Sequence, residues 1–452
     1  MTDSRPPLRP RLPAVRDQGD FGTCWSFAII GSMESNLIQK GAVSKDINLS
    51  EYYLAYYTFN DESKRLYSFR SAKDTGFDTE ATDWKSAAIL ARGTGPVYER
   101  EAPYPKKKSP AARPPVLPRK FKLRSVLYLP DENNCNVPLR GERIRTVKEA
   151  ILRYGAASAV LYCPDRDEGE RMDMEDLLSS SWGYYSGFLS AEEHRKDGRF
   201  REPNHDVMIV GWDDGFSRDR FGGAYNPALK PEKDGAWVVR NSWGGKWGDK
   251  GYFYVSYEEG TMMNGIFYEA VPAVPDENIY QYDVLGMSYH INGDFVPVAD
   301  KQRGAEAWCA NIFTAVRAER INSVAFYTTE GGTECEVMIY QGCPSGSPVG
   351  GTLATSLKLT AEAPGYHTVD LPQSVAVKSG ERFSVVVRLK SPRDEFPIAV
   401  ERKLDEDLSY DKSSAAPGES WISATGKYWT DLYDLDETAN VCVKAFATPA
   451  AE

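Results

Sequence analysis

The chain has 452 residues, of which 41% are hydrophobic and 26% are charged. This length exceeds what one hydrophobic core usually supports, so two or three domains of a soluble globular protein are expected. A formal net charge of −11 argues against nucleic acid as the main partner, because phosphate binding requires a basic surface. The chain has no run of about 18 apolar residues, so no membrane span is predicted. The proline-rich start of the chain lacks the apolar segment of a signal peptide, so none is predicted.

Cysteine spacing bears on metal and disulfide chemistry. The seven cysteines are Cys24, Cys135, Cys163, Cys309, Cys335, Cys343 and Cys442. An odd number leaves at least one thiol unpaired. No two of them have CxxC spacing, so neither a zinc site nor a thioredoxin-type motif is predicted, and no metal or cofactor is expected. Apart from Cys24, they could be buried thiols or form disulfides; buried thiols are favoured in a chain long enough to have cores of its own.

Helices are predicted in the first part of the chain. Residues 24–41 repeat apolar side chains at helical spacing, at Phe27, Ile30, Met33 and Leu37. Gly41 suits the end of this helix, because glycine readily adopts the left-handed backbone found there. Two further helices are predicted at residues 82–93 and 145–155.

From residue 156 onward the pattern changes to strands. Four β-rich segments bounded by glycine or aspartate lie at residues 156–162, 205–214, 235–243 and 251–257. Helices followed by strands predict an α+β domain with two segregated lobes.

The remainder of the chain predicts a second domain. Residues 271–283 are interpreted as a linker, and beyond them short strands alternate with turn clusters. This spacing, without a strong helix, predicts an all-β sandwich. The predicted domains are residues 1–275 and residues 276–452.

Three segments carry a candidate for nucleophilic catalysis. Cys24 opens the first predicted helix, where the helix dipole lowers the pKa of a thiol. His205 begins a predicted strand and Asn241 ends another, and a cysteine nucleophile needs such a base with an orienting partner. Gln18, six residues before Cys24, could donate to the oxyanion together with the Cys24 backbone N–H. Singly, these residues could be a buried thiol, a core histidine and a turn asparagine, but their occurrence together in this order favours a catalytic site.

These segments resemble the papain family of cysteine peptidases. The sequence QGDFGTCW, residues 18–25, matches the family's nucleophile segment except at Phe21 and Thr23. His205 precedes the apolar strand VMIVGW, and NSWG from Asn241 is followed by WGDKGY. The resemblance covers about residues 10–271. It implies a papain-like two-lobed catalytic domain that hydrolyses peptide bonds in proteins through an acyl-enzyme on Cys24.

The resemblance also implies supporting roles. Trp243 would shield the hydrogen bond between His205 and Asn241 from water, and Trp25 belongs to the same nucleophile motif as a support residue. Phe21 stands where the family has a disulfide-forming cysteine, and Phe77 stands near the place of that cysteine's partner. The family's central disulfide is therefore not expected.

Two acidic residues suggest a substrate preference. Asp206 follows the catalytic histidine, where the family borders the subsite for the second residue before the scissile bond. Alignment of the domain's closing strand places Glu269 near the floor of that subsite. Two carboxylates there would attract a cationic side chain. The alternative is that Asp206 faces solvent or accepts a backbone N–H, and that Glu269 lies outside the subsite.

The C-terminal domain resembles the lectin-like β-sandwich attached to papain-type peptidases of bacteria. Its function could be structural or docking, and an aromatic-rich stretch could stack on sugar rings or form sandwich core: Trp421, Tyr428, Trp429 and Tyr433. Expected partners are protein or peptide substrates and a carbohydrate or cell-surface ligand. The resemblance implies a secreted, periplasmic or cell-surface location. The competing interpretation is a papain-fold binding or adhesion protein with little or no peptidase activity.

Overall fold

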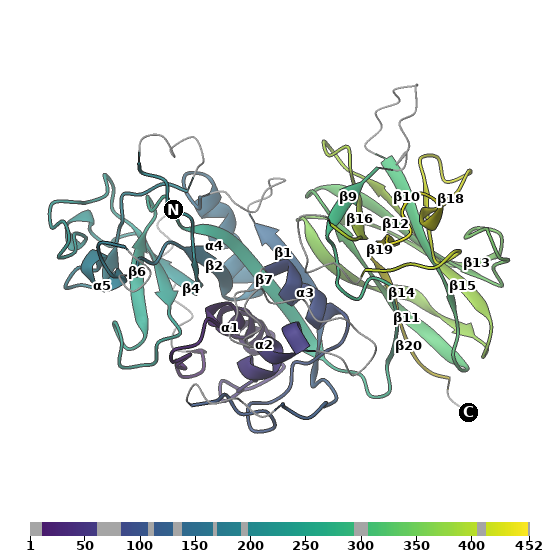
Figure 1. The fold of residues 1–452 in the computed structure, drawn as a ribbon, viewed down its shortest axis with the longest axis horizontal. Helices are drawn as coiled ribbons and strands as arrows, with labels where there is room; N and C mark the ends of the chain where they lie inside the picture. Colours follow the sequence, from purple (N-terminus) through teal and green to yellow (C-terminus); the bar gives the residue numbers. More distant parts are fainter. Residues whose placement is uncertain are drawn as a thin grey trace.

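The computed structural model describes residues 11–60, 83–106, 113–129, 138–165, 170–190, 198–292, 306–404 and 413–450. Helices lie in the first part of the chain, and strands make up nearly all of the second part (Figure 1). The predicted class, an α+β domain followed by an all-β domain, is confirmed. Within the described ranges, no helix is both long enough and apolar enough to cross a membrane.

Three of the α-helices in the described residues follow the predicted ranges, and two are additions. The α-helices are α1 (Cys24–Gln39), α2 (Glu51–Asn60), α3 (Asp83–Ala91), α4 (Arg143–Tyr154) and the short α5 (Met174–Leu177), and two 3₁₀ turns lie at Arg218–Arg220 and Leu432–Asp434. Neither the short α5 nor α2 was predicted. Eight of the ten residues of α2 are buried, so it has no polar face and its sequence shows no helical stripe.

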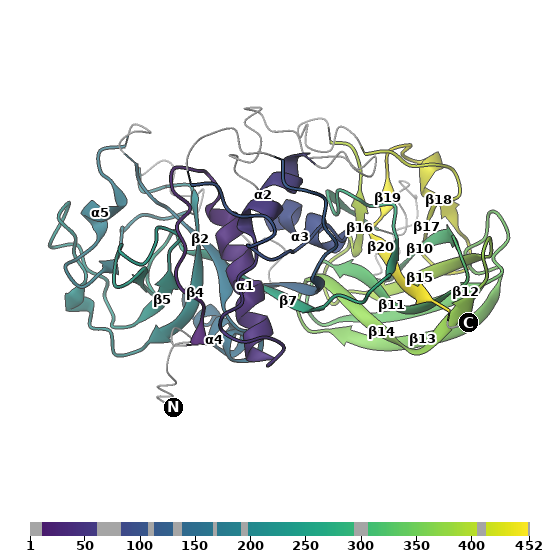
Figure 2. The same ribbon diagram turned by 90° about the horizontal axis from the view of Figure 1, so that it is seen from below.

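Helix α1 is the central helix of the peptidase domain. It is buried along most of its length and packs on strands β4 and β7 as well as on α2 (Figure 2). Its C-terminal end is closed by Gly41, which has φ +68°, with hydrogen bonds from the N–H of Gly41 to Ile38 and from the N–H of Ala42 to Leu37. This pair of bonds is a Schellman motif, so the predicted helix end is confirmed.

The strands of the described residues form three sheets. One sheet has eleven strands in the order β3-β6-β5-β4-β2-β7-β1-β14-β11-β20-β8, the second has six in the order β13-β12-β15-β10-β17-β18, and the third has three in the order β19-β16-β9. Their bounds are β1 Phe121–Leu129, β2 Ala157–Leu161, β3 Gly183–Tyr184, β4 His205–Asp213, β5 Ala236–Arg240, β6 Tyr252–Ser256, β7 Met263–Pro272, β8 Asn278–Tyr280, β9 Tyr289–Ile291, β10 Glu306–Thr314, β11 Glu319–Thr328, β12 Thr333–Gln341, β13 Thr352–Ala361, β14 Gly365–Val377, β15 Arg382–Lys390, β16 Ile398–Glu401, β17 Ser420–Ser423, β18 Thr430–Asp431, β19 Asn440–Val441 and β20 Val443–Pro449.

The two predicted domains are joined through the largest sheet. Strand β1 pairs on one side with β7 of the peptidase domain and on the other with β14 of the sandwich, where Ser125 lies opposite His367. A single apolar core also contains Trp25 of α1 together with Tyr366 and Phe446 of the sandwich. The seam is therefore a continuous sheet with a shared core.

The segment predicted as a linker is partly ordered into strands. Strand β7 continues to Pro272, and β8 pairs with β20 inside the region expected to be a linker. Between them, the Glu277 carboxylate forms ion pairs with Arg119 and Lys122. Backbone pairing and buried charges hold parts of residues 271–283 in place, so the connection between the domains is ordered here, and its interpretation as a linker stays a prediction. The boundary between residues 275 and 276 stays a prediction.

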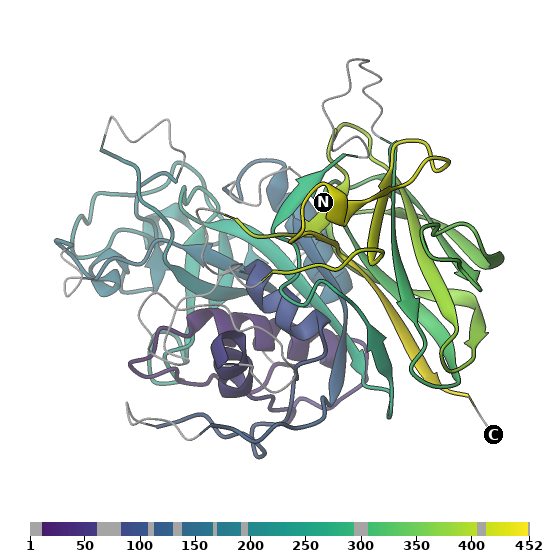
Figure 3. The same ribbon diagram turned by 45° about the vertical axis from the view of Figure 1, so that its right-hand side comes forward.

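The sandwich encloses its own core between two strand layers (Figure 3). Side chains alternate as a sandwich requires: in β10, Cys309 and Phe313 face the core, while Trp308 and Ile312 lie on the opposite face of the sheet. The six cysteines in the described residues are all free thiols, as favoured from the sequence. Cys135 and Phe77 lie outside the described residues.

Candidate active site

Three elements bring the proposed catalytic residues together. Cys24 is the first residue of α1, His205 is the first residue of β4, and Asn241 directly follows β5. Strands β4 and β5 pair antiparallel, with Met208 opposite Arg240, so His205 and Asn241 lie at the same end of neighbouring strands. Helix α1 packs across β4, which places its N-terminal end at this edge.

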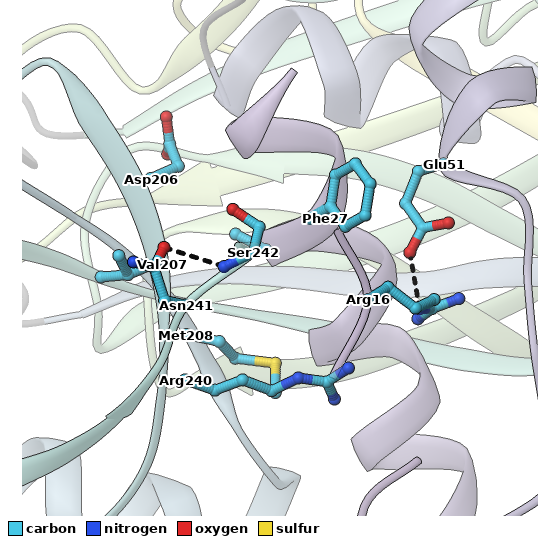
Figure 4. Close-up of a pocket in the computed structure, with 10 residues that line it drawn as sticks. Arg16, Phe27, Glu51, Asp206, Val207, Met208, Arg240, Asn241 and Ser242 are labelled. Atoms are coloured by element: carbon cyan, nitrogen blue, oxygen red, sulfur yellow. Dashed lines mark hydrogen bonds and ion pairs between the residues drawn. The ribbon is translucent and has the colours of Figure 1, made fainter. Parts of the chain in front are cut away.

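The hydrogen bonds of Asn241 define the protonation of the histidine. The Oδ1 atom of Asn241 accepts from the backbone N–H of Ser242 at 2.8 Å (Figure 4) and lies 2.9 Å from Nε2 of His205. A backbone N–H only donates, so this Asn241 atom is the oxygen, and Nε2 of His205 must carry a hydrogen. In the neutral ring Nδ1 is then unprotonated. His205 therefore has the tautomer of a base whose second nitrogen can accept a proton.

The histidine ring is covered and neutral. Trp243 lies with its ring centre 5.0 Å from that of His205, at an interplanar angle of 31°. Burial lowers the pKa of His205 to about 4, and the hydrogen bond to Asn241 opposes this shift. At pH 7 the imidazole is therefore uncharged, which is the form that can accept a proton.

Gln18 is held by residues on both sides of the site. Its backbone N–H donates to the Ser242 carbonyl at 2.8 Å, and its Oε1 accepts from the Ser242 hydroxyl. Its Nε2 donates to the carbonyl of Phe21 at 2.7 Å, in the loop that leads into Cys24. An amide nitrogen has two hydrogens, so this contact uses one of two donors.

Asp206 contacts the nucleophile directly. One carboxylate oxygen of Asp206 lies 3.9 Å from Sγ of Cys24. Asp206 also borders a small cavity between β4 and α1, together with Phe27 and Asn241 (Figure 4). A carboxylate in this position would oppose a negative charge on the sulfur and attract a positive charge entering the cleft.

The structure does not bring Glu269 to Asp206. Glu269 accepts a hydrogen bond from Lys40 at 2.7 Å and another from Ser125. Lys40 caps the C-terminal end of α1, whereas Cys24 begins the same helix, which is 16 residues or roughly 24 Å long. The predicted pair of acidic residues in one subsite is therefore wrong, because β7 carries Glu269 to the opposite end of α1.

Two features of the site were not predicted from the sequence. The ring of Tyr104 packs at 5.8 Å and 5.0 Å from those of Phe21 and Phe27, and its hydroxyl lies 3.1 Å from the Gln18 carbonyl, to which it donates. Tyr104 therefore braces the loop before Cys24. It lies outside every motif in the sequence, so only tertiary contact reveals it.

The second feature is a buried charge cluster behind the cleft. Arg16 forms ion pairs with Glu34 and Glu51, both of which are fully buried. Burial raises the pKa of Glu51 to about 8, and the Arg16 guanidinium opposes this shift. The cluster anchors the segment before Gln18 to α1 and α2. In the described residues, no group of three or more metal-binding side chains is close enough to hold a metal ion.

Comparison with known families agrees with this geometry. The sequence model described as papain family cysteine protease matches residues 2–140 and 172–272, which is more than half of the chain. The chain belongs to the papain family of cysteine proteases. A second model, described as lectin like domain, matches residues 279–447. The resemblance of both parts to these families is thereby confirmed.

Individual relatives match the peptidase part. Mouse pro-cathepsin H is 26% identical over 252 residues, which are 56% of this chain and 58% of that protein. A cysteine protease of Blomia tropicalis is 27% identical over 259 residues, 57% of this chain and 60% of that protein. The chain thus spans about three fifths of the length of these relatives.

Solved structures match the whole chain. The clostridial cysteine protease Cwp84 after propeptide cleavage superposes with a TM-score of 0.75 at 23% identity, covering 98% of both chains. A structure of the cysteine protease and lectin-like domains of Cwp84, a surface layer associated protein of Clostridium difficile, gives a TM-score of 0.73 at 23% identity, covering 98% of this chain and 87% of that one. The arrangement of a papain-like domain followed by a lectin-like sandwich is therefore a known fold.

Proposed function

We propose that this protein hydrolyses peptide bonds in proteins, with Cys24 as nucleophile, His205 as base and acid, and Asn241 as the residue that orients the histidine. The observation that carries the proposal is the hydrogen bond from Nε2 of His205 to Oδ1 of Asn241, which leaves Nδ1 to serve a nucleophile. Membership of the papain family and the position of Cys24 at the start of α1 support it.

The reaction begins with acylation. The Cys24 thiol transfers its proton to Nδ1 of His205, and the sulfur attacks the carbonyl carbon of the substrate. The resulting oxyanion accepts from the Cys24 backbone N–H and from the second N–H of Gln18. When the tetrahedral intermediate collapses, His205 gives its proton to the leaving nitrogen, and the C–N bond breaks to leave a thioester on Cys24.

Deacylation reverses the roles. His205 takes a proton from a water molecule, whose oxygen attacks the thioester carbon, and the carboxylic acid leaves as Cys24 regains its proton. Trp243 keeps water from the hydrogen bond between His205 and Asn241 in both steps. No charge is placed on Asn241 at any point, which distinguishes it from an aspartate in the same position.

A covalent inhibitor provides the direct test. An epoxysuccinyl inhibitor of the E-64 type should add one inhibitor mass to the folded, reduced protein, at Cys24 and at no other thiol. The Cys24→Ala variant should take up no label and hydrolyse no peptide. A parent protein that resists labelling and hydrolysis would favour the competing function, a papain-fold binding or adhesion protein.

We further propose that Asp206 favours substrates with a cationic second residue before the scissile bond. The support is its carboxylate beside Cys24 and its place on the cavity wall, since a carboxylate in a partly dry site is best satisfied by a positive partner. Fluorogenic peptides with Arg or Leu at that position test it. Asp206→Ala should lose the preference for Arg, whereas Asp219→Ala, at an exposed aspartate, should keep it. A parent that prefers Leu would refute the assignment.

We propose that the lectin-like domain binds a carbohydrate or another cell-surface ligand and that the protein acts outside the cytoplasm, at the cell surface. The surface layer association of Cwp84 supports the location. Among the aromatic side chains, Tyr428 is 83% exposed and available for stacking, whereas Trp421 is buried. Binding of cell-wall polysaccharide to the protein should weaken in Tyr428→Ala, and equal binding by both proteins would remove Tyr428 from such a site.

A further inference from the structure

A line of aromatic rings leads from the catalytic histidine to the protein surface. The Trp243 ring, which lies over His205, is 5.0 Å from the ring of Trp247 in an edge-to-face arrangement. The Trp247 ring is in turn 6.1 Å from that of Trp182, at an angle of 47°. Trp182 is 37% exposed, so the line ends at solvent.

The position of the acid determines which part of a substrate meets this line. His205 must protonate the leaving nitrogen, so the chain that follows the scissile bond departs past His205 and the covering Trp243. An extended peptide advances about 3.3–3.6 Å per residue. Three ring-to-ring steps of 5.0–6.1 Å therefore bring Trp182 within reach of the second to fourth residue after the scissile bond.

The backbone of Trp182 is held in an unfavourable conformation. Its φ is +61°, in the left-handed region that bulky residues rarely adopt. A tight turn imposes it: the Trp182 N–H donates to the Ser179 carbonyl at 2.9 Å, and the Ser179 hydroxyl accepts from the N–H of Gly183 at 3.0 Å. The Trp182 carbonyl accepts from the N–H of Tyr254, which fastens the turn to strand β6. Glycine or asparagine would fit this backbone with less strain, and strained residues of this kind concentrate at functional sites.

The neighbouring ring is fixed in direction by a polar contact. Nε1 of Trp247 donates to the Glu175 carboxylate at 3.0 Å, just after the start of α5. This contact sets the plane of the Trp247 ring, and the rings of Trp182 and Trp243 both pack against that ring. Helix α5 and this turn lie at the end of the peptidase domain away from the sandwich (Figure 1). The sandwich therefore lies on the far side of the peptidase domain from α5.

We infer that Trp182 is a specificity-determining residue for the leaving-group side of the substrate, where its ring contacts an aromatic side chain two to four residues after the scissile bond. This inference rests on the proposed peptidase function. It assigns the exposed ring a ligand of matching chemistry, since aromatic side chains pack favourably on an indole face.

Acyl transfer measures this side of the site alone. An ester substrate with no residue after the scissile bond acylates Cys24, and an added tetrapeptide amide then competes with water: its amine forms an amide bond with the acyl group, and Cys24 returns as the thiol. Tetrapeptides with Phe at position two, three or four are compared with the all-alanine peptide in the same protein. For each peptide, the partition coefficient compares transfer of the acyl group to the peptide amine with transfer to water. The ratio of the coefficients for two peptides does not depend on the rate of acylation.

The parent should favour at least one Phe peptide over the alanine peptide by about fivefold or more. Trp182→Ala and Trp182→Gly should reduce this ratio to near one, and the glycine variant does so while relieving the backbone strain. Trp182→Phe should retain most of the ratio, and Phe396→Ala, at an exposed aromatic residue of the sandwich, should retain all of it. A parent without a Phe preference, or an unchanged ratio in Trp182→Ala, would overturn the inference.

A separate readout covers an inactive protein. If the ester is not turned over, the proposed peptidase function fails, and binding of a fluorescent Phe tetrapeptide to the Cys24→Ala protein is measured instead. Tighter binding of the Phe peptide than of the alanine peptide, lost in the Cys24→Ala/Trp182→Ala double variant, would still support the aromatic contact. Equal binding of the two peptides would overturn it.

Discussion

At the scale of single residues, the site depends on an uncharged orienting group. Asn241 receives two donors on one oxygen, which determines both its own orientation and the tautomer of His205. Because Trp243 also packs on the histidine ring, the ring is restrained by more than one contact. Loss of the orienting group therefore leaves the base in place, whereas loss of His205 removes the base itself.

This difference predicts an order of effects on turnover. His205→Ala should abolish peptide hydrolysis, while Asn241→Ala should leave measurable activity, because Trp243 still limits rotation of the ring. Gln18→Ala should lower kcat by on the order of 10²–10³, as expected for loss of one oxyanion donor. Steady-state kinetics on a good fluorogenic peptide would check the order. Activity of Gln18→Ala equal to that of the parent would exclude Gln18 from the oxyanion site.

At the scale of elements, helix α1 carries the proposed nucleophile and also forms part of the buried core. Its N-terminal end carries Cys24, and its C-terminal end is closed by Gly41 in the left-handed conformation. The helix is almost wholly buried, so its ends determine how the nucleophile sits against β4.

The helix end can be tested with a pair of glycine variants. A Cβ atom at Gly41 would meet no other atom, so Gly41→Ala changes only the cost of the positive φ, and it should destabilise the protein by about 1 kcal/mol. Gly245→Ala also adds a Cβ in open space, but without a positive φ, and should be close to neutral. Urea unfolding of both variants gives the comparison. Equal stability of the two would show that the αL closure contributes nothing.

At the scale of the whole molecule, the junction between the two domains combines a tight backbone contact with buried charges. Strand β14 begins at Gly365, opposite Leu127 of β1. Beneath the seam, Lys444 and Asp283 form a buried ion pair at 2.7 Å, near the fully buried Glu401. Both features favour one fixed arrangement of the domains.

The backbone contact predicts a specific sensitivity to substitution. Gly365 has φ +139°, and a Cβ there would overlap the carbonyl oxygen of Val126 across the seam. Gly365→Ala should therefore lower the melting temperature markedly, whereas Gly380→Ala, which also has a positive φ but open space, should lower it only slightly. Differential scanning calorimetry separates the two. A Gly365→Ala protein as stable as Gly380→Ala would mean that the strands can shift apart without cost.

The buried carboxyl group at the junction predicts a pH dependence. Burial, reinforced by the charge of Asp283, raises the pKa of Glu401 from 4.5 to about 8. The unfolded chain loses this proton near pH 4.5, so the stabilisation is complete below that pH and is lost as the pH rises through 8. The free energy of unfolding of Glu401→Gln, relative to that of the parent, should therefore rise by about 2–4 kcal/mol between pH 5 and pH 8.

Chemical denaturation at several pH values would measure this gain. Glu437→Gln removes a carboxyl group at an exposed position of the same domain and should show no such trend. A difference between parent and Glu401→Gln that stays constant from pH 5 to pH 8 would contradict the predicted titration.

The sequence by itself predicted the candidate nucleophile, base and orienting asparagine, and it determined the order of the two domains. Each of these depends on a local motif or on periodicity, such as Cys24 at a helix start or alternation in the sandwich strands. Such local patterns can be recognised directly in the amino-acid sequence. Helix α2 escaped because all its sides are buried, so its sequence has no stripe to detect. Only the tertiary structure decided which residues that are distant in the chain lie together.

Glu269 and Asp206 both lie beside α1 but at opposite ends of it, a separation set by strand register rather than by sequence distance. The continuous sheet through β1 and β14, the bracing by Tyr104 and the surface position of Trp182 likewise arise from contacts between residues far apart in the chain. Such contacts form only when the chain closes its long loops, and their partners leave no periodic trace in the sequence.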